Sequence, residues 1–153
     1  MMHYFAYGSN MDERQMAVRC PGAVAVGKAV LADYRLAFTI YSSVRRCGCA
    51  DIVKSRADNV WGLLYRLTER DMLSLDAYEG APAHYRRLTI IVSDVFGNDV
   101  EAEAYEVANK EREHQKPSDA YLGMILDASA RYGFPEDYRG ILERVVCLSR
   151  FET

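Results

Sequence analysis

Apolar and polar positions divide the chain into a strand-rich first part and a helical last third. Residues 2–7 are an apolar run that predicts a buried first strand. Residues 34–41 alternate between apolar and polar side chains, which predicts a half-buried strand with Thr39 on its polar face. Residues 60–67 are almost continuously apolar and predict a central strand.

Turn and capping signals place the next elements. Thr68 precedes a short helix that is expected to end at Gly80, because glycine commonly ends helices. Residues 86–95 and 100–107 are strand-like on both sides of the sequence FGND, which predicts a β-hairpin.

The start of the chain carries a further capping signal. Asn10 is followed three positions later by Glu13, a spacing typical of a capping box. The sequence therefore predicts that Asn10 caps a short helix directly after the first strand.

The last third predicts two helices. Ser118 follows Pro117 as a start signal, and Gly133 ends the first helix. Apolar residues recur there at helical spacing: Tyr121, Ile125, Ala128 and Tyr132. Pro135 opens the second helix, whose apolar face holds Tyr138, Ile141, Leu142 and Val145. Strands followed by helices indicate an α+β fold, and we expect residues 1–153 to form a single domain.

Composition narrows the function classes. The chain has 153 residues, half of them hydrophobic, and a net charge of −3, which gives no electrostatic reason to expect nucleic acid or an anionic membrane as partner. No stretch approaches the roughly 18 apolar residues of a membrane span, and no signal peptide is visible. We therefore expect a cytoplasmic protein with reduced cysteines.

Two short stretches hold candidate chemistry. Gly8, Ser9 and Asn10 follow the first strand and predict either a plain turn or an anion-holding loop. Glu79 lies at the predicted end of a helix, where the helix dipole disfavours an acidic side chain. Taken alone, an exposed terminal glutamate remains the simpler interpretation.

Other catalytic or metal sites find little support. Cys47 and Cys49 form C-x-C without a second pair, and the three histidines show no ligand spacing, so we expect no metal. The G-S-N sequence differs from the G-x-S-x-G elbow of serine hydrolases, although a nucleophilic Ser9 stays open. Considered singly, the tyrosines indicate core packing.

Taken together, five motifs resemble the γ-glutamylcyclotransferase family in order and spacing. They span nearly the whole chain and read FAYGSN, VWGLLYRL, LDAYEGAPAHY, AEAYEV and KPSDAYLGMILDASARYGFPEDY. The resemblance implies a small mixed β-barrel-like sheet with packed helices. Residues 42–59 fit the family pattern poorly, and the two cysteines there receive no role from it.

The resemblance also implies an activity and a site. Enzymes of this family convert γ-glutamyl amines to 5-oxoproline and a free amine, without metal or cofactor. Glu79 would be the acid/base, and the substrate would be held by Tyr7, Gly8, Ser9, Asn10, Tyr85, Tyr105 and Tyr121. If Glu79 has this role, we expect it to be buried, walled by tyrosines, and not paired with Arg86 or Arg87.

Two alternatives remain open at this point. A binding module would keep the pocket without turnover, and a Ser9-dependent hydrolase would release glutamate instead of 5-oxoproline. The sequence leaves open which amine is attached to the γ-glutamyl group and released in the reaction. It also leaves open whether apolar residues on the terminal helices pack internally or form a homodimer.

Overall fold

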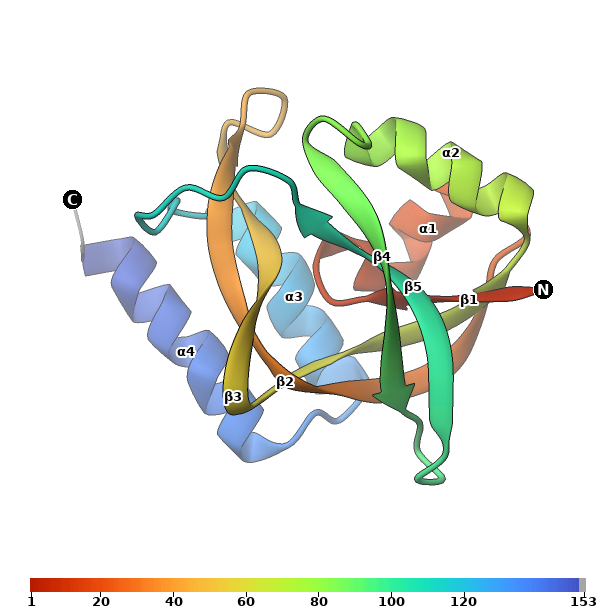
Figure 1. Cartoon of the computed structure of the whole chain (residues 1–153). Helices are drawn as coiled ribbons and strands as arrows, with labels where there is room; N and C mark the ends of the chain where they lie inside the picture. Colours follow the sequence, from red (N-terminus) through yellow and green to blue (C-terminus); the bar gives the residue numbers. More distant parts are fainter. Residues whose placement is uncertain (152–153) are drawn as a thin grey trace.

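The chain folds into a closed five-stranded barrel with helices packed around it (Figure 1). The structure is a computed structural model that describes the backbone of residues 1–151 and the side chains up to residue 145. The strand order around the barrel is β1-β3-β2-β4-β5. The predicted α+β class with a barrel-like sheet is confirmed. In chain order the elements are β1 (Met2–Ala6), the short 3-10 helix η1 (Ser9–Met11), α1 (Glu13–Arg19), β2 (Val24–Ser42), β3 (Cys47–Leu67), α2 (Glu69–Glu79), β4 (Tyr85–Ser93), β5 (Asp99–Val107), α3 (Asp119–Arg131) and α4 (Glu136–Phe151).

Strands β2 and β3 are much longer than the predicted strands at residues 34–41 and 60–67. They pair with each other antiparallel along nearly their whole length and form a bent ribbon. Three register shifts interrupt the pairing, and Asp33 and Ala57 adopt left-handed φ values of 63° and 68°. Such irregularities bend strands and disturb the alternation of apolar positions, which is why the pattern identified only part of each strand.

Asn10 does not cap the first helix, contrary to the prediction. Asp12 is the N-cap of α1, and its carboxylate accepts a hydrogen bond from the backbone N–H of Arg14 at 2.9 Å. The turn of η1 intervenes, closed by a hydrogen bond from the Met11 N–H to the Gly8 carbonyl. This turn delays the helix start by two residues and leaves the Asn10 side chain free to point inward.

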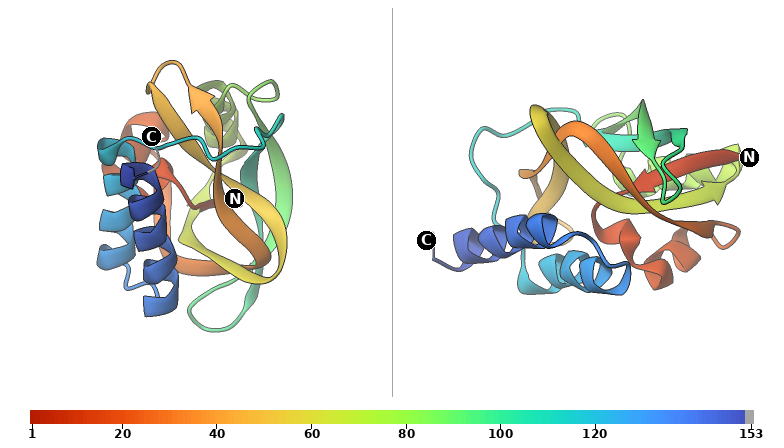
Figure 2. Two further views of the ribbon diagram at one scale, coloured as in Figure 1. Left: turned by 90° about the vertical axis from the view of Figure 1, so that its left-hand side faces the viewer. Right: turned by 90° about the horizontal axis from the view of Figure 1, so that it is seen from below.

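The other predicted helices and the hairpin are confirmed. Thr68 caps α2, and Gly80 ends it with a left-handed φ of 63°. Strands β4 and β5 pair up to Ser93 and Asp99, on both sides of the predicted turn. Ser118 caps α3. Figure 2 shows α3 and α4 side by side and antiparallel, packed against one side of the barrel.

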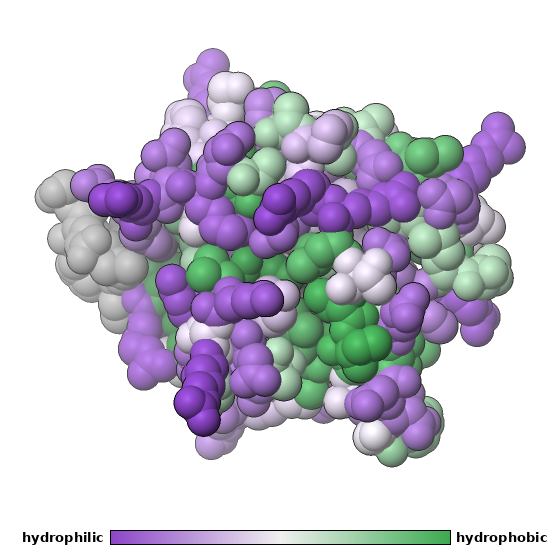
Figure 3. All heavy atoms as spheres, viewed as in Figure 1, coloured by the Kyte–Doolittle hydropathy of each residue, from purple (hydrophilic) through white to green (hydrophobic). Residues whose placement is uncertain are grey.

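The core fills the barrel and the space beneath the helices. Its largest fully buried side chains are Tyr65, Phe5, Met11, Met16, Ile52, Leu63, Leu64, Leu67, Met72, Leu75, Ile125 and Leu142. On the face drawn in Figure 3, hydrophobic residues gather over the middle and hydrophilic ones lie around them. Within residues 1–151, no helix is long and apolar enough to cross a membrane. Homodimer formation stays a prediction.

The segment 108–117 crosses the β2–β3 ribbon on its way from β5 to α3 (Figure 1). Its backbone is hydrogen-bonded to both strands; for example, the Gly48 N–H donates to the Lys116 carbonyl at 2.7 Å. Gly48 is required for this approach, since a Cβ atom there would lie 1.7 Å from the Gln115 carbonyl oxygen. The segment therefore fixes the ribbon beside the barrel mouth.

Asp51 on β3 secures the same junction. Its side chain is fully buried and accepts hydrogen bonds from the Val107 N–H at 2.9 Å and from Lys110 at 2.8 Å. Thr39 donates to it at 2.7 Å and is only 8% exposed, so the prediction that Thr39 lies on an outward polar face is wrong. The buried carboxylate draws Thr39 inward because it needs donors.

Replacing Asp51 should destabilise the fold. Asp51→Ala leaves a buried N–H and a lysine without their acceptor, so we expect a loss of about 3 kcal/mol in the free energy of unfolding. Urea denaturation measures it, with Asp127→Ala on the exposed face of α3 as control. A loss for Asp51→Ala no larger than for the control would contradict this account.

Candidate active site

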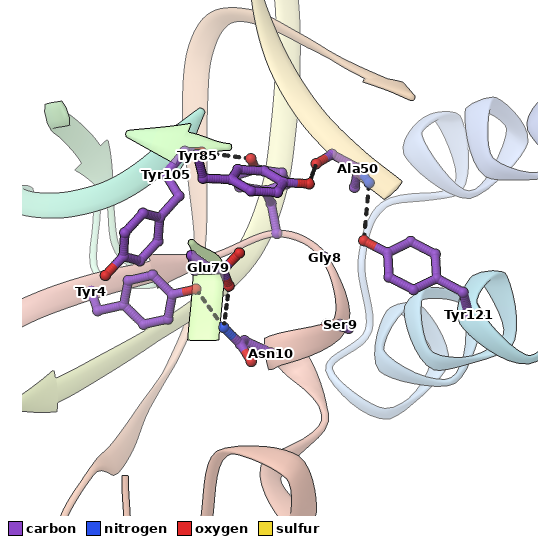
Figure 4. A pocket seen from close by; sticks show the side chains of 10 residues that line it. Tyr4, Gly8, Ser9, Asn10, Ala50, Glu79, Tyr85, Tyr105 and Tyr121 are labelled. Atoms are coloured by element: carbon purple, nitrogen blue, oxygen red, sulfur yellow. Dashed lines mark hydrogen bonds between the residues drawn. The ribbon is translucent and has the colours of Figure 1, made fainter. Parts of the chain in front are cut away.

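A small pocket at the mouth of the barrel brings together all the residues predicted from the sequence. Its volume is about 40 Å³. Figure 4 shows that the residues lining it come from β1, the β1–η1 loop, η1, β3, the end of α2, β4, β5 and α3. Its lining consists of the predicted Tyr7, Gly8, Ser9, Asn10, Glu79, Tyr85, Tyr105 and Tyr121, with Tyr4 and Ala50 in addition. The sequence stretches that are far apart along the chain thus form one site.

Glu79 is the ionisable group with the most distinctive surroundings. Its side chain is only 17% exposed, and its Oε1 atom accepts a hydrogen bond from the Asn10 side chain at 3.2 Å. Arg19 approaches the same oxygen only to 3.8 Å. Burial raises the pKa of Glu79, and this effect outweighs the opposing influence of Arg19, Arg45 and the Asn10 hydrogen bond. The carboxyl group therefore takes up a proton more readily than a free glutamate does.

The two arginines that follow α2 are bound elsewhere, as the sequence led us to expect. Arg86 pairs with Glu106 at 3.0 Å. Arg87 binds both carboxylate oxygens of Asp76, at 2.8 and 2.9 Å. Neither arginine forms an ion pair with Glu79 among the described residues.

Asp76 and Glu79 lie one turn apart on α2 but have opposite pKa shifts. Burial alone would raise the pKa of Asp76, but hydrogen bonds from Arg87 and from the Tyr105 hydroxyl outweigh it and lower that pKa. The Tyr105 bond is 2.6 Å long. One carboxyl group thus stays ionised in a structural role, while the other is placed to exchange a proton.

Asn10 holds Glu79 in place. Its side chain is buried, and its amide nitrogen donates both to Glu79 and to the Tyr4 hydroxyl, the latter at 2.9 Å. Its amide oxygen accepts from Gln15 at 2.8 Å and from Arg19 at 3.0 Å. Because these bonds fix the amide orientation, a nitrogen donor always faces the carboxylate.

Tyrosines form most of the wall. Tyr85 donates to the Ala50 carbonyl at 2.7 Å, and the Ala50 N–H donates to the Tyr121 hydroxyl at 2.9 Å. Tyr7 donates to the carbonyl of Tyr105. Burial is the largest cause that raises the pKa of each of these tyrosines. They remain neutral at physiological pH and add no charge beside Glu79.

The loop after β1 presents backbone to the pocket. Gly8 has a φ of −115°, so the left-handed conformation that glycine allows is not used. A side chain would be crowded here instead, since a Cβ atom would lie 3.2 Å from the Tyr121 hydroxyl and in contact with the Ala50 Cβ at 3.4 Å. Among the described residues, the N–H groups of Gly8, Ser9 and Asn10 have no hydrogen-bond acceptor. They are free to bind an anionic group.

A second, larger cavity continues outward from the pocket. Its volume is about 440 Å³, and it shares Ser9, Glu79, Tyr85 and Tyr121 with the inner pocket. Its outer walls come from the ends of α1 and α2 and from the turn between β2 and β3. Glu79 therefore lies at the junction of a narrow inner space and a wide outer one.

Comparison with known proteins identifies the family. A sequence model described as "Gamma-glutamyl cyclotransferase, AIG2-like" matches residues 4–123. The chain belongs to this family. A gamma-glutamylcyclotransferase of Mus musculus is 32% identical over 147 residues, which cover 93% of this chain and 77% of the relative. The Bos taurus protein of the same name is 31% identical with the same coverage. The prediction of an enzyme of the γ-glutamylcyclotransferase family is thereby confirmed.

Solved structures of the family agree with the fold. A structure titled gamma-glutamyl cyclotransferase has a TM-score of 0.85 and 28% identity, and the match covers 93% of this chain and 86% of that one. YkqA from Bacillus subtilis has a TM-score of 0.78 and 25% identity, with 98% of this chain and 54% of YkqA covered. The fold of this chain is thus shared with both of these proteins.

Sequence reasoning missed four side chains around the site. Tyr4 precedes the recognised loop, and Asp76 lies in the LDAYEG motif three residues before Glu79. The three-residue spacing of Asp76 and Glu79, which places both carboxyl groups on one face of the helix, could have identified Asp76. Arg19 and Arg45 carried no signal, since α1 and the β2–β3 turn lie outside the recognised motifs.

The raised pKa of Glu79 predicts that this residue costs stability. In the unfolded chain the pKa is about 4.3, so as pH rises through the higher folded-state pKa, ionisation lowers the free energy of unfolding. Glu79→Gln keeps the shape and removes the charge. We therefore expect a higher Tm than wild type at pH 7 and no difference below about pH 4.

Thermal unfolding followed by circular dichroism at several pH values makes this measurement. Glu69→Gln is the control, because Glu69 lies on the same helix and its side chain is 57% exposed. It should not raise Tm. A lower Tm for Glu79→Gln than for wild type at pH 7 would contradict the buried-charge account.

Proposed function

We propose that this protein converts γ-glutamyl amino acids or amines to 5-oxoproline and the free amine, with Glu79 as general acid and base. The observation that carries the proposal is the raised pKa of one carboxyl group in a tyrosine-walled pocket, next to unpaired backbone N–H groups. Membership of the γ-glutamylcyclotransferase family supplies the reaction class.

The reaction needs no nucleophile from the protein. The α-amine of the substrate attacks its own γ-carbonyl carbon, a new carbon–nitrogen bond closes the ring, and the original amide bond breaks. Well-oriented intramolecular attack of this kind accounts for about 7–11 kcal/mol of a reaction barrier. The protein therefore has to fold the substrate, help to move protons from the ammonium to the leaving nitrogen, and stabilise the oxyanion.

Glu79 is placed for the proton transfer. In its ionised form it takes a proton from the substrate ammonium, and it then gives that proton to the departing nitrogen. The second ammonium proton, still on the ring nitrogen after the attack, passes to the freed amine, which leaves as an ammonium. A carboxylate with an ordinary pKa is a weak base towards the ammonium in the first step, so the raised pKa of Glu79 favours the cycle. The single Asn10 hydrogen bond orients the carboxylate without neutralising it.

The loop is suited to the charge that develops on the substrate. Gly8, Ser9 and Asn10, whose backbone N–H groups have no acceptor among the described residues, line the same pocket as Glu79. A well-aimed backbone donor lowers the barrier by roughly 3 kcal/mol when it binds an oxyanion. In this proposal the γ-glutamyl group fills the inner pocket, and the leaving amine departs into the outer cavity.

A Ser9 nucleophile is disfavoured by its contacts. The Ser9 hydroxyl oxygen accepts hydrogen bonds from Gln15 at 2.9 Å and from Arg45 at 3.2 Å. Both partners are donors, and neither can remove the hydroxyl proton. Nucleophilic serine requires an adjacent base in hydrogen-bond reach.

A binding module without turnover is disfavoured by Glu79 itself. A buried carboxyl group is costly, and it repels the carboxylates of a γ-glutamyl ligand. That arrangement is useful to an enzyme that transfers a proton there. Incubation of the protein with γ-glutamyl-alanine distinguishes the two, because a module binds it without forming 5-oxoproline.

Glu79→Gln should abolish most of the turnover. Loss of the acid/base lowers rates by about 10²–10⁴-fold, so we expect kcat for 5-oxoproline formation to fall at least about a hundredfold while the fold is retained. Glu69→Gln removes an equal charge from the exposed end of α2, and it should stay within about twofold of wild type. Near-wild-type activity of Glu79→Gln would refute the assignment.

Ser9→Ala tests the hydrolase alternative. Because Ser9 contributes its backbone N–H in our proposal, the alanine variant should keep most of its rate and still form 5-oxoproline from γ-glutamyl-alanine. Chromatography that separates glutamate from 5-oxoproline gives the answer. Glutamate as the wild-type product, together with an inactive Ser9→Ala variant, would favour the hydrolase.

A further inference from the structure

The outer cavity carries positive charge that the proposed reaction does not use. Among the described residues that line it, Arg19 and Arg45 are permanently cationic, and Glu79 is the one carboxylate. Arg19 is already engaged, since it contacts Asn10 at 3.0 Å and Glu79 at 3.8 Å and lies over the Tyr78 ring. Arg45 is therefore the cation available to a ligand.

Arg45 is held in place by neutral groups. It lies in the turn between β2 and β3 and is half-buried, with its guanidinium over the Tyr121 ring at 5.1 Å. Its Nη2 atom donates to Ser9 at 3.2 Å and to the Gln15 side-chain oxygen at 2.9 Å. Within the described residues it forms no ion pair, and its Nε and Nη1 donors have no acceptor.

This arrangement is unusual for a purely structural arginine. Taking a charge partly out of water is unfavourable unless a counter-charge compensates for it. An uncharged amide donor could hydrogen-bond equally well to neutral acceptors such as Ser9 and Gln15. A fixed guanidinium with free donors fits a carboxylate, which it can bind through two parallel hydrogen bonds.

The position of Arg45 indicates which carboxylate it binds. No cationic side chain lines the inner pocket among the described residues, so the γ-glutamyl group there is held by backbone N–H groups in our proposal. Arg45 lines the outer cavity and not the inner pocket, and it is therefore on the side where the leaving amine departs in our proposal. In a γ-glutamyl amino acid, the leaving side carries its own free carboxylate.

We propose that Arg45 selects substrates whose leaving side bears a carboxylate, so that γ-glutamyl amino acids are used in preference to uncharged γ-glutamyl amines. This inference rests on the proposed function and refines it. Arg45 also offsets the repulsion between that carboxylate and Glu79, because it lines the same outer cavity and adds positive charge there. It is a specificity residue and takes no part in the proton transfer.

The test compares γ-glutamyl-alanine with its neutral, isosteric γ-glutamyl-alaninamide. A charge-assisted bidentate contact predicts that wild-type kcat/KM favours the free acid by about 10- to 100-fold. Arg45→Met keeps a long, flexible side chain and removes the guanidinium and its charge. We expect it to lower kcat/KM for the acid far more than for the amide, so that the ratio approaches one.

Two further variants are matched to this one. Arg46→Met removes the same charge from the next residue, which is exposed and does not line the cavity, so it should keep the wild-type ratio. Arg45→Lys keeps a positive charge without the planar fork and should retain part of the preference. If Arg45→Met does not fold, Arg45→Gln and the salt dependence of the wild-type ratio test the same point, since salt weakens the preference if it is electrostatic.

The outcomes separate this inference from the proposed function. Equal losses on both substrates in Arg45→Met would mean that Arg45 only positions Ser9 and Gln15, and would overturn the inference. A wild-type ratio near one with 5-oxoproline formed from both compounds would also overturn it, while leaving the proposed function intact. If neither compound gives 5-oxoproline, the proposed function fails and this inference fails with it.

Discussion

Burial of the Glu79 carboxyl group without a close cationic partner is the condition on which the site depends. The pocket wall of neutral tyrosines raises the pKa, while Arg19 at 3.8 Å and one Asn10 hydrogen bond keep the group oriented but lower that pKa too little to reverse the shift. A cation in bidentate contact would reverse it, as Arg87 does for Asp76 on the same helix. The raised pKa of Glu79, on which the proposed proton transfer depends, therefore requires that Arg19 stays at a distance and that Arg87 binds Asp76 instead.

The fold determines those positions through long-range contacts. Helix α2 brings Glu79 to the barrel mouth, and the loop after β1 supplies both Asn10 and the unpaired backbone N–H groups. The β2–β3 ribbon, secured by buried Asp51, delivers Ala50 to the inner pocket and Arg45 to the outer cavity. The narrow space where ring closure is proposed and the wide space for the leaving side thus meet at one carboxyl group.

The sequence revealed those parts that local physics determines. Gly80 ends α2 because it adopts a left-handed φ, which glycine allows. Thr68 and Ser118 cap their helices by accepting hydrogen bonds from nearby backbone N–H groups, so these helix starts could also be predicted from the local sequence. Asn10 was misread as a cap because its partners, Tyr4 and Glu79, are brought to it only by the folded chain. The full ribbon and Arg45 were missed because bulges break the strand pattern and the turn belongs to no recognised motif. Motif order located the site, and tertiary contacts determined its electrostatics.

The most direct test of the central claim is an NMR titration of the side-chain carboxyl carbons, with Glu79 assigned by comparison with Glu79→Gln. The account predicts a midpoint for Glu79 clearly above the value of about 4.3 for a free glutamate. It also predicts a midpoint for Asp76 below the usual range of an aspartate. A Glu79 midpoint at or below that of a free glutamate would contradict the account, because the carboxyl group would then lack the buried environment that the proton transfer requires.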